Sequence, residues 1–156
     1  MIRLGVISDS HHSEHWTGLF LNRANRERYD AVYFLGDGES EAKWLKRRLT
    51  MPFQYVAGNC DMFSKTPREL LVNHGSHRIL AVHGHLFDVK WEMDTLSYYA
   101  EERGADIVLY GHTHNPRAEY VGPVLMVNPG ALMDGCFAEL YIDGNRVTPR
   151  LLRLGE

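Results

Sequence analysis

Six short apolar segments, each ending abruptly in polar residues or glycine, constrain the fold of this chain more than any other feature. The segments are 2–7, 31–35, 53–57, 79–82, 107–110 and 124–127. Short, continuous apolar runs of this kind are typical of strands that are buried on both faces of a sheet. We therefore expect six buried strands, each followed by a polar loop.

The residues that follow these segments are of types that bind metal ions or contact phosphate. They are Asp9-Ser10-His11, Gly36-Asp37, Gly58-Asn59-Cys60-Asp61, His83-Gly84-His85, Gly111-His112-Thr113-His114 and Asn128-Pro129-Gly130. In open α/β sheets the ligand site lies beyond the carboxyl ends of the strands, so these loops should meet at one rim. The metal-binding residue types collected at this rim predict a metal centre with room for two ions, and they favour a protein that cleaves phosphate esters.

Helical spacing of apolar residues and turn signals predict the remaining elements. Surface helices are expected at about 14–28, about 39–49 and from Met93 to near Gly104. Turn residues at 74–76, 122–123 and 143–145 predict three hairpins, and hence a second, mostly antiparallel sheet. The predicted fold class is α/β, a four-layer αββα sandwich of two mixed sheets with the metal site at the strand carboxyl ends. We expect a single domain over residues 1–156.

Composition narrows the class of protein. The net charge of −3 does not indicate nucleic acid as a partner, and no apolar run approaches the length of a membrane span. The two cysteines form no C-x-x-C pattern, which fits a reducing cytoplasm and predicts a cytoplasmic protein without membrane contact.

Single motifs have ordinary alternatives. Asp37 could cap the helix that follows it, and Gly58-Asn59 could form an Asx-turn. Four histidines in two strand-end blocks are harder to explain as structural residues. The turn at Asn128-Pro129-Gly130 could buttress the histidine loop or approach the substrate.

Taken in order, the motifs D-x-H, G-D, G-N-x-D, H-G-H, G-H-T-H and N-P-G resemble those of the calcineurin-like metallophosphoesterases. The resemblance covers about residues 2–130 and is nearest to the small, cap-less bacterial and archaeal phosphodiesterase branch. It implies a hydroxide nucleophile that bridges two ions, with Asp37 shared between them. One ion would be held by Asp9, His11, Asp37 and His114, and the other by Asp37, Asn59, His83 and His112.

The resemblance also places His85 in the substrate pocket, where it could stabilise developing charge. We expect Asp61 to orient a ligand imidazole, because ligating histidines usually donate their second N–H to an acceptor. Imidazole nitrogens with carboxylate and amide oxygens suit two divalent ions, Mn²⁺ in the first place and Fe²⁺, Zn²⁺, Ni²⁺ or Co²⁺ otherwise. The expected activity is hydrolysis of a small phosphodiester.

Two departures from the family pattern bear on activity. Cys60 stands where many relatives have a histidine that acts as general acid or substrate clamp, and a thiol is a poorer donor to an alkoxide. The small phosphodiesterase branch often shares this cysteine, which puts efficient monoester hydrolysis in doubt. Ala131 replaces a frequent serine near the site.

Two other functions remain open at this point. A non-catalytic protein-interaction scaffold exists within the same family, although it has lost part of the ligand set that is complete here. A nuclease would use basic helix residues such as Arg23, Arg26 and 46–48, for which solvated helix faces are the simpler explanation. Exposed hairpin edges such as 146–152 could pair across a homodimer.

Overall fold

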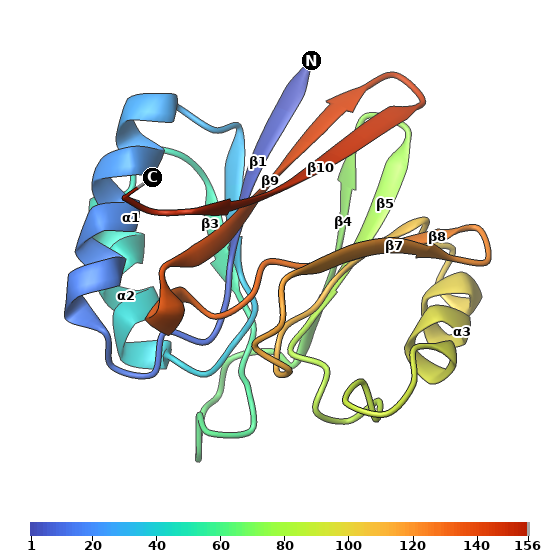
Figure 1. The fold of residues 1–156 in the computed structure, drawn as a ribbon, viewed down its shortest axis with the longest axis horizontal. Helices are drawn as coiled ribbons and strands as arrows, with labels where there is room; N and C mark the ends of the chain where they lie inside the picture. Colours follow the sequence, from blue (N-terminus) through green and yellow to red (C-terminus); the bar gives the residue numbers. More distant parts are fainter. Residues whose placement is uncertain (156) are drawn as a thin grey trace.

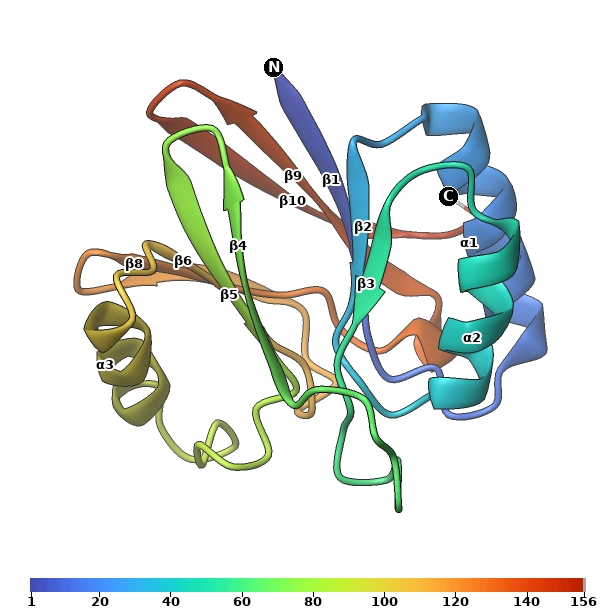
Figure 2. The ribbon, with the colours of Figure 1, turned by 180° about the vertical axis from the view of Figure 1, so that it is seen from behind.

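The computed structural model describes residues 1–155, so Glu156, the last residue of the predicted domain, lies outside the described residues. Two five-stranded sheets face one another (Figures 1 and 2). Sheet A has the order β10-β9-β1-β2-β3, formed by Arg146–Arg153, Cys136–Asp143, Ile2–Ile7, Ala31–Phe34 and Phe53–Tyr55. Sheet B has the order β4-β5-β6-β8-β7, formed by Glu69–His74, His77–Val82, Ile107–Leu109, Val124–Asn128 and Arg117–Val121.

Helices cover the outer face of each sheet. Helices α1 (Glu14–Glu27) and α2 (Glu39–Arg48) lie on sheet A, and α3 (Asp94–Glu102) lies on sheet B (Figure 1). A short 3₁₀ helix, η1 (Leu132–Asp134), precedes β9. The predicted four-layer αββα sandwich is therefore confirmed. No helix within residues 1–155 combines the length and the apolar character needed to cross a membrane.

Alternation along the strands produces the layers. On β9, Ala138 and Leu140 are buried between the two sheets, whereas Phe137 faces the helices. The Phe137 ring packs against Phe20 of α1, with ring centroids 5.9 Å apart. Helix α1 begins where the Ser13 hydroxyl accepts a hydrogen bond from the backbone N–H of Trp16. The same sequence thus fills the central core and attaches the outer helices.

Each sheet contains three neighbouring parallel strands, β1, β2 and β3 in sheet A and β5, β6 and β8 in sheet B. Because these strands are parallel, their carboxyl ends lie at the same end of each sheet, and β1, β3 and β5 run toward the lower end of the molecule in Figures 1 and 2. The expectation that the second sheet is mostly antiparallel is wrong. The β9–β10 hairpin joins sheet A beside β1, with Ile2 opposite Ile142, so antiparallel pairs occur in both sheets. Turn residues specify a hairpin, but they do not specify the sheet that receives it.

Candidate metal centre

Two buried carboxylates form the base of the site, at the carboxyl ends of β1 and β2. The Asp9 side chain is fully buried, and Asp37 is 3% exposed. One oxygen of each is occupied by the protein: Asp9 Oδ2 accepts from the Ser8 hydroxyl at 2.5 Å, and Asp37 Oδ1 accepts from the Cys60 backbone N–H at 2.8 Å. The other oxygen of each carboxylate faces the histidines.

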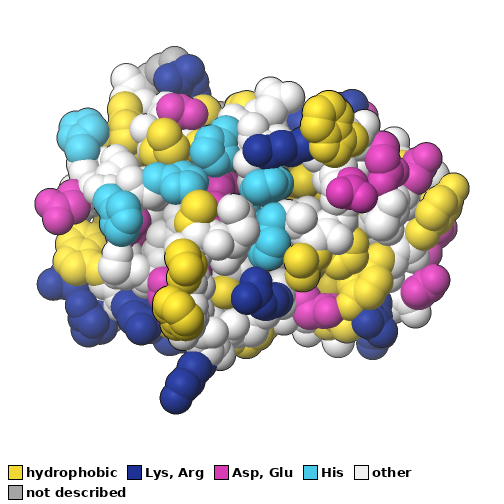
Figure 3. All heavy atoms as spheres, turned by 90° about the horizontal axis from the view of Figure 1, so that it is seen from below, with side chains coloured by type: hydrophobic (Ala, Val, Ile, Leu, Met, Phe, Trp, Pro, Cys, Tyr) yellow, Lys and Arg dark blue, Asp and Glu magenta, His cyan; other side chains and the backbone are white. Residues whose placement is uncertain are grey.

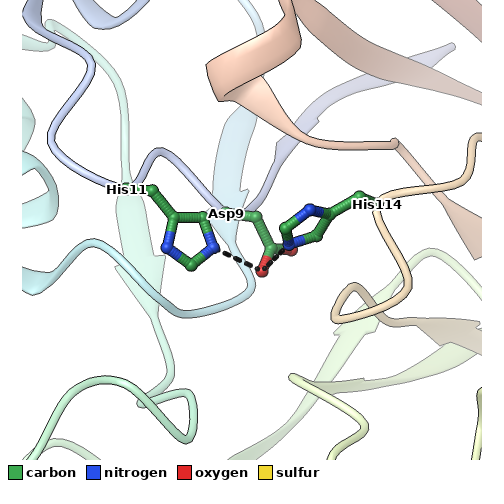
Figure 4. A group of neighbouring side chains, drawn as sticks. All are labelled: Asp9, His11 and His114. Carbon is green, nitrogen blue, oxygen red and sulfur yellow. Dashed lines mark ion pairs between the residues drawn. The ribbon is translucent and has the colours of Figure 1, made fainter.

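Histidine nitrogens from both sheets surround these free oxygens. His83 Nε2 lies 3.0 Å from Asp9 Oδ1 and 3.2 Å from Asp37 Oδ2, and it therefore connects the two carboxylates. His11 Nε2 and His114 Nε2 lie 3.5 and 3.3 Å from Asp9 Oδ1, with the two rings on opposite sides of the carboxylate (Figure 4). The site is thus assembled across the interface between the sheets.

In the described part of the chain, residues 1–155, three groups of side chains are compact enough to hold an ion, each with ligand atoms within 4.8 Å of one another. Two of them contain only residues that the sequence predicts as metal ligands, and the third adds the thiol of Cys60. The groups are Asp9, His11 and His114; Asp37, His83 and His112; and His11, Asp37 and Cys60.

Opposite charges in this buried site hold each other ionised. Burial alone would raise the pKa of Asp37, but hydrogen bonds from His83 and the Cys60 backbone outweigh burial and lower the pKa to about 2. Burial alone would lower the pKa of His83, but the Asp37 and Asp9 carboxylates raise it to about 9. The negative charge of the two carboxylates, which favours a proton on His83, would equally favour a metal cation in place of that proton.

The donor set fits a divalent metal ion. Among residues 1–155, His11 Nε2 is buried and has no hydrogen-bond partner, a rare state for a ring nitrogen that a coordinated ion would relieve. Imidazole nitrogens and carboxylate oxygens together suit the transition-metal ions. Asp9 Oδ1, at 3.5 Å from His11 Nε2, is placed to share such an ion with it.

Backbone strain is concentrated on the predicted ligands. Five of the seven have positive φ angles: Asp9, His11, Asp37, His112 and His114, at 55°, 41°, 60°, 71° and 62°. This left-handed region is uncommon for residues with a side chain and is typical of functional sites. Backbone hydrogen bonds between the loops hold this conformation at two of the residues. The N–H of Asp9 donates to the Gly36 carbonyl at 2.9 Å, and the N–H of His11 donates to the Asp37 carbonyl at 3.2 Å.

Asn59 and Asp61 follow β3 on the same loop. Asn59 is exposed, and its amide donates to Cys60 Sγ at 3.7 Å. We expected Asp61 to orient a ligand imidazole, and no such hydrogen bond is present within residues 1–155. Its carboxylate instead accepts from the backbone N–H groups of residues 37, 38, 39 and 58 at 2.8–3.1 Å. Asp61 therefore fixes the backbone around Asp37 rather than a histidine ring.

His85 lies beside the predicted ligands. Its Nδ1 is 3.1 Å from His83 Nδ1, and its Nε2 is 3.3 Å from Nη1 of Arg68. Figure 3 shows histidines gathered on this face of the molecule, with basic and hydrophobic side chains next to them. The half-exposed position of His85 is compatible with contact to a substrate.

The structure also identifies supporting residues. Of the two roles considered for the turn at 128–130, the structure shows support of the histidine loop. The Asn128 amide donates to the Gly111 carbonyl at 3.2 Å and to the Thr113 hydroxyl at 2.9 Å. Sequence analysis missed Glu41, which accepts from the Ser10 hydroxyl at 2.5 Å and holds the loop that carries His11. Arg68 was missed as well. Both come from segments with no motif, so only the fold brings them to the site.

Comparisons with known proteins agree with this geometry. Residues 2–141 match the calcineurin-like phosphoesterase superfamily domain. The chain is 37% identical over 127 residues to the probable metallophosphoesterase YsnB of Bacillus subtilis, covering 81% of this chain and 73% of that protein.

Solved structures show the same fold. A predicted phosphoesterase from Streptococcus pneumoniae has a TM-score of 0.83 at 31% identity, covering 97% of this chain and 89% of that one. Vacuolar protein sorting 29 from Cryptosporidium parvum also has a TM-score of 0.83, at 21% identity and with 99% and 93% coverage. The family match extends over most of the sequence and includes every predicted ligand, and the chain therefore belongs to the calcineurin-like phosphoesterase superfamily.

Proposed function

We propose that this protein is a dinuclear metal-dependent phosphodiesterase. One ion would be bound by Asp9, His11, Asp37 and His114, and the other by Asp37, Asn59, His83 and His112. The observation that carries the proposal is the pair of adjacent ligand groups, one around Asp9 and one around Asp37, linked by His83 at 3.0 and 3.2 Å. Mn²⁺ as the preferred metal and a cytoplasmic location stay predictions.

The charge balance of the site favours an anionic substrate. Two divalent ions would bring four positive charges, of which the two aspartates compensate half. Bound ions of this kind lower the pKa of water toward about 7 and polarise phosphoryl oxygens. Within the chain, hydrogen bonds from the Ser8 hydroxyl and the Cys60 backbone N–H orient the Asp9 and Asp37 carboxylates, and His85 lies 3.1 Å from His83, next to the ligands.

The test is hydrolysis of bis-p-nitrophenyl phosphate by metal-stripped protein, with and without added Mn²⁺. We expect turnover that requires metal and exceeds turnover of p-nitrophenyl phosphate, because Cys60 replaces a stronger proton donor. Asp37→Ala should abolish it, since Asp37 would bind both ions. Asp143→Ala, at the last residue of β9 at the other end of the sandwich, is the matched control and should retain activity. Near-normal turnover by Asp37→Ala would refute the shared-ligand assignment.

A protein-interaction scaffold is the second candidate, favoured by exposed apolar side chains on the loops that carry site residues. Phe63 is 96% exposed and Trp91 87% exposed, with Met62 and Leu86 also exposed. Exposed apolar groups of this kind mark interaction sites when they are contiguous. Tight, stoichiometric metal binding without turnover on either ester would support the scaffold and contradict the phosphodiesterase.

A further inference from the structure

Arg68 lies next to the candidate metal centre, just before β4. Its side chain is exposed, and its Nη1 is 3.3 Å from His85 Nε2. His85 Nδ1 is in turn 3.1 Å from His83 Nδ1, while His83 Nε2 faces the Asp9 and Asp37 carboxylates. A continuous chain of polar contacts therefore joins Arg68 to the predicted metal ligands.

Metal binding at His83 would determine the hydrogen positions along this chain. A histidine that binds an ion through Nε2 carries its hydrogen on Nδ1. His83 Nδ1 would then donate to His85 Nδ1, and a neutral His85 ring would carry its hydrogen on Nε2. That nitrogen faces Arg68 Nη1, which can only donate because a guanidinium has no acceptor. In that state two donors would face each other across the 3.3 Å contact, and each would need an acceptor.

The described residues 1–155 supply no such acceptor. Arg68 forms no ion pair with a carboxylate in this range, and His85 Nε2 is the only polar atom there in close contact with its guanidinium. A free guanidinium matches phosphate oxygens in charge and geometry.

We infer that Arg68 is a substrate-binding residue that, together with His85, holds a non-bridging oxygen of the phosphoryl group. This inference rests on the proposed phosphoesterase function. It assigns Arg68 to substrate affinity and leaves the metal ligands unchanged.

The first test is binding of inorganic phosphate to the Mn²⁺-loaded protein, measured by isothermal titration calorimetry without any turnover. We expect Arg68→Ala to weaken binding about tenfold, the effect of losing one charge-assisted hydrogen bond. Arg68→Lys keeps the charge without the planar fork and should recover part of the affinity. Arg47→Ala removes an exposed arginine of α2 and should bind phosphate as the unmodified protein does.

The second test is steady-state hydrolysis of bis-p-nitrophenyl phosphate. Arg68→Ala should raise KM about tenfold and change kcat by less than about twofold, and added guanidinium ion should restore part of the loss. Unchanged KM and unchanged phosphate affinity in Arg68→Ala would overturn the inference, as would undetectable phosphate binding by the unmodified protein. If the unmodified protein binds phosphate but turns over neither ester, the proposed function fails, and the phosphate affinities still decide the role of Arg68.

Discussion

His77 joins the two sheets at the end of the sandwich away from the candidate metal centre, and its replacement should have a pH-dependent effect on stability. His77 Nδ1 lies 2.6 Å from Asp106 Oδ2, and Nε2 lies 2.7 Å from the Gly144 carbonyl oxygen in the β9–β10 turn. Both partners accept, so the imidazolium form, with a hydrogen on each ring nitrogen, is the one that satisfies both contacts. Burial alone would lower the pKa of His77, but the hydrogen bonds to Asp106 and Gly144 raise it.

A raised pKa in the folded state means that protonated His77 stabilises the fold. This contribution is complete below the unfolded pKa of about 6.5 and is lost as the pH rises through the raised folded pKa. A hydrogen bond to a charged group contributes about 1.5–3 kcal/mol. The Asp106 side chain is 46% exposed, so solvent screens that pair and the lower end of the range applies.

We expect His77→Ala to lower the free energy of unfolding by about 2 kcal/mol near pH 6. In a protein of this size the loss corresponds to a fall of about 4–8 °C in Tm. Above the folded pKa, the difference in stability between His77→Ala and the unmodified protein should shrink. In a neutral ring one of the two nitrogens carries no hydrogen, and it then faces an oxygen that can only accept. The change in stability cannot exceed about 1.4 kcal/mol per pH unit for one proton.

The assay is urea unfolding of metal-free protein at a series of pH values, comparing His77→Ala with the unmodified chain. The comparison cancels the titration of distant groups, including the site histidines. Asp106→Asn retains an acceptor oxygen but removes the charge that favours protonated His77. The pH at which the stabilisation by His77 is lost should therefore be lower in this variant. A destabilisation by His77→Ala that stays constant from acid to alkaline pH would refute the imidazolium assignment.

Two further predictions concern the candidate metal centre. Asp61→Ala removes the acceptor of four backbone N–H groups and should lower the free energy of unfolding by about 3 kcal/mol, measured by denaturant titration. Asp61→Asn should have intermediate stability. Equal stability of the two variants and the unmodified protein would contradict this prediction. Mn²⁺ at a thousandfold excess over its Kd should stabilise the protein by about 4 kcal/mol, seen as a higher Tm that Asp37→Ala abolishes. A Tm that does not respond to Mn²⁺ would count against metal binding.

The sequence predicted the parts of the fold and site that depend on local pattern. Asp9, Asp37 and His83 each lie within three residues of the end of a buried strand, and parallel strands bring their carboxyl ends to one rim, so their proximity could be expected. The same local pattern placed the helices to within a few residues, because apolar spacing reflects which face is buried.

Features that depend on distant partners could not be predicted. Nothing in the sequence distinguishes His77 from a surface histidine, since its partners lie 29 and 67 residues away. Arg68 is similarly separated from His85 by 17 residues and belongs to no motif. The left-handed backbone of the ligands was also missed, because loop geometry depends on contacts between loops.

The place of β1 has a consequence for synthesis of the chain. β1 lies in the middle of sheet A, between β2 and β9, and pairs Ile2 with Ile142. Sheet B is formed entirely by residues 69–128, so all of its strands leave the ribosome before β9 does. Until β9 has been synthesised, one edge of β1 stays unpaired, and an unpaired strand edge can pair with other chains. The backbone N–H groups of Leu132 and Met133 donate to the carbonyls of Ser8 and Asp9, so the site is completed only after these residues have been synthesised.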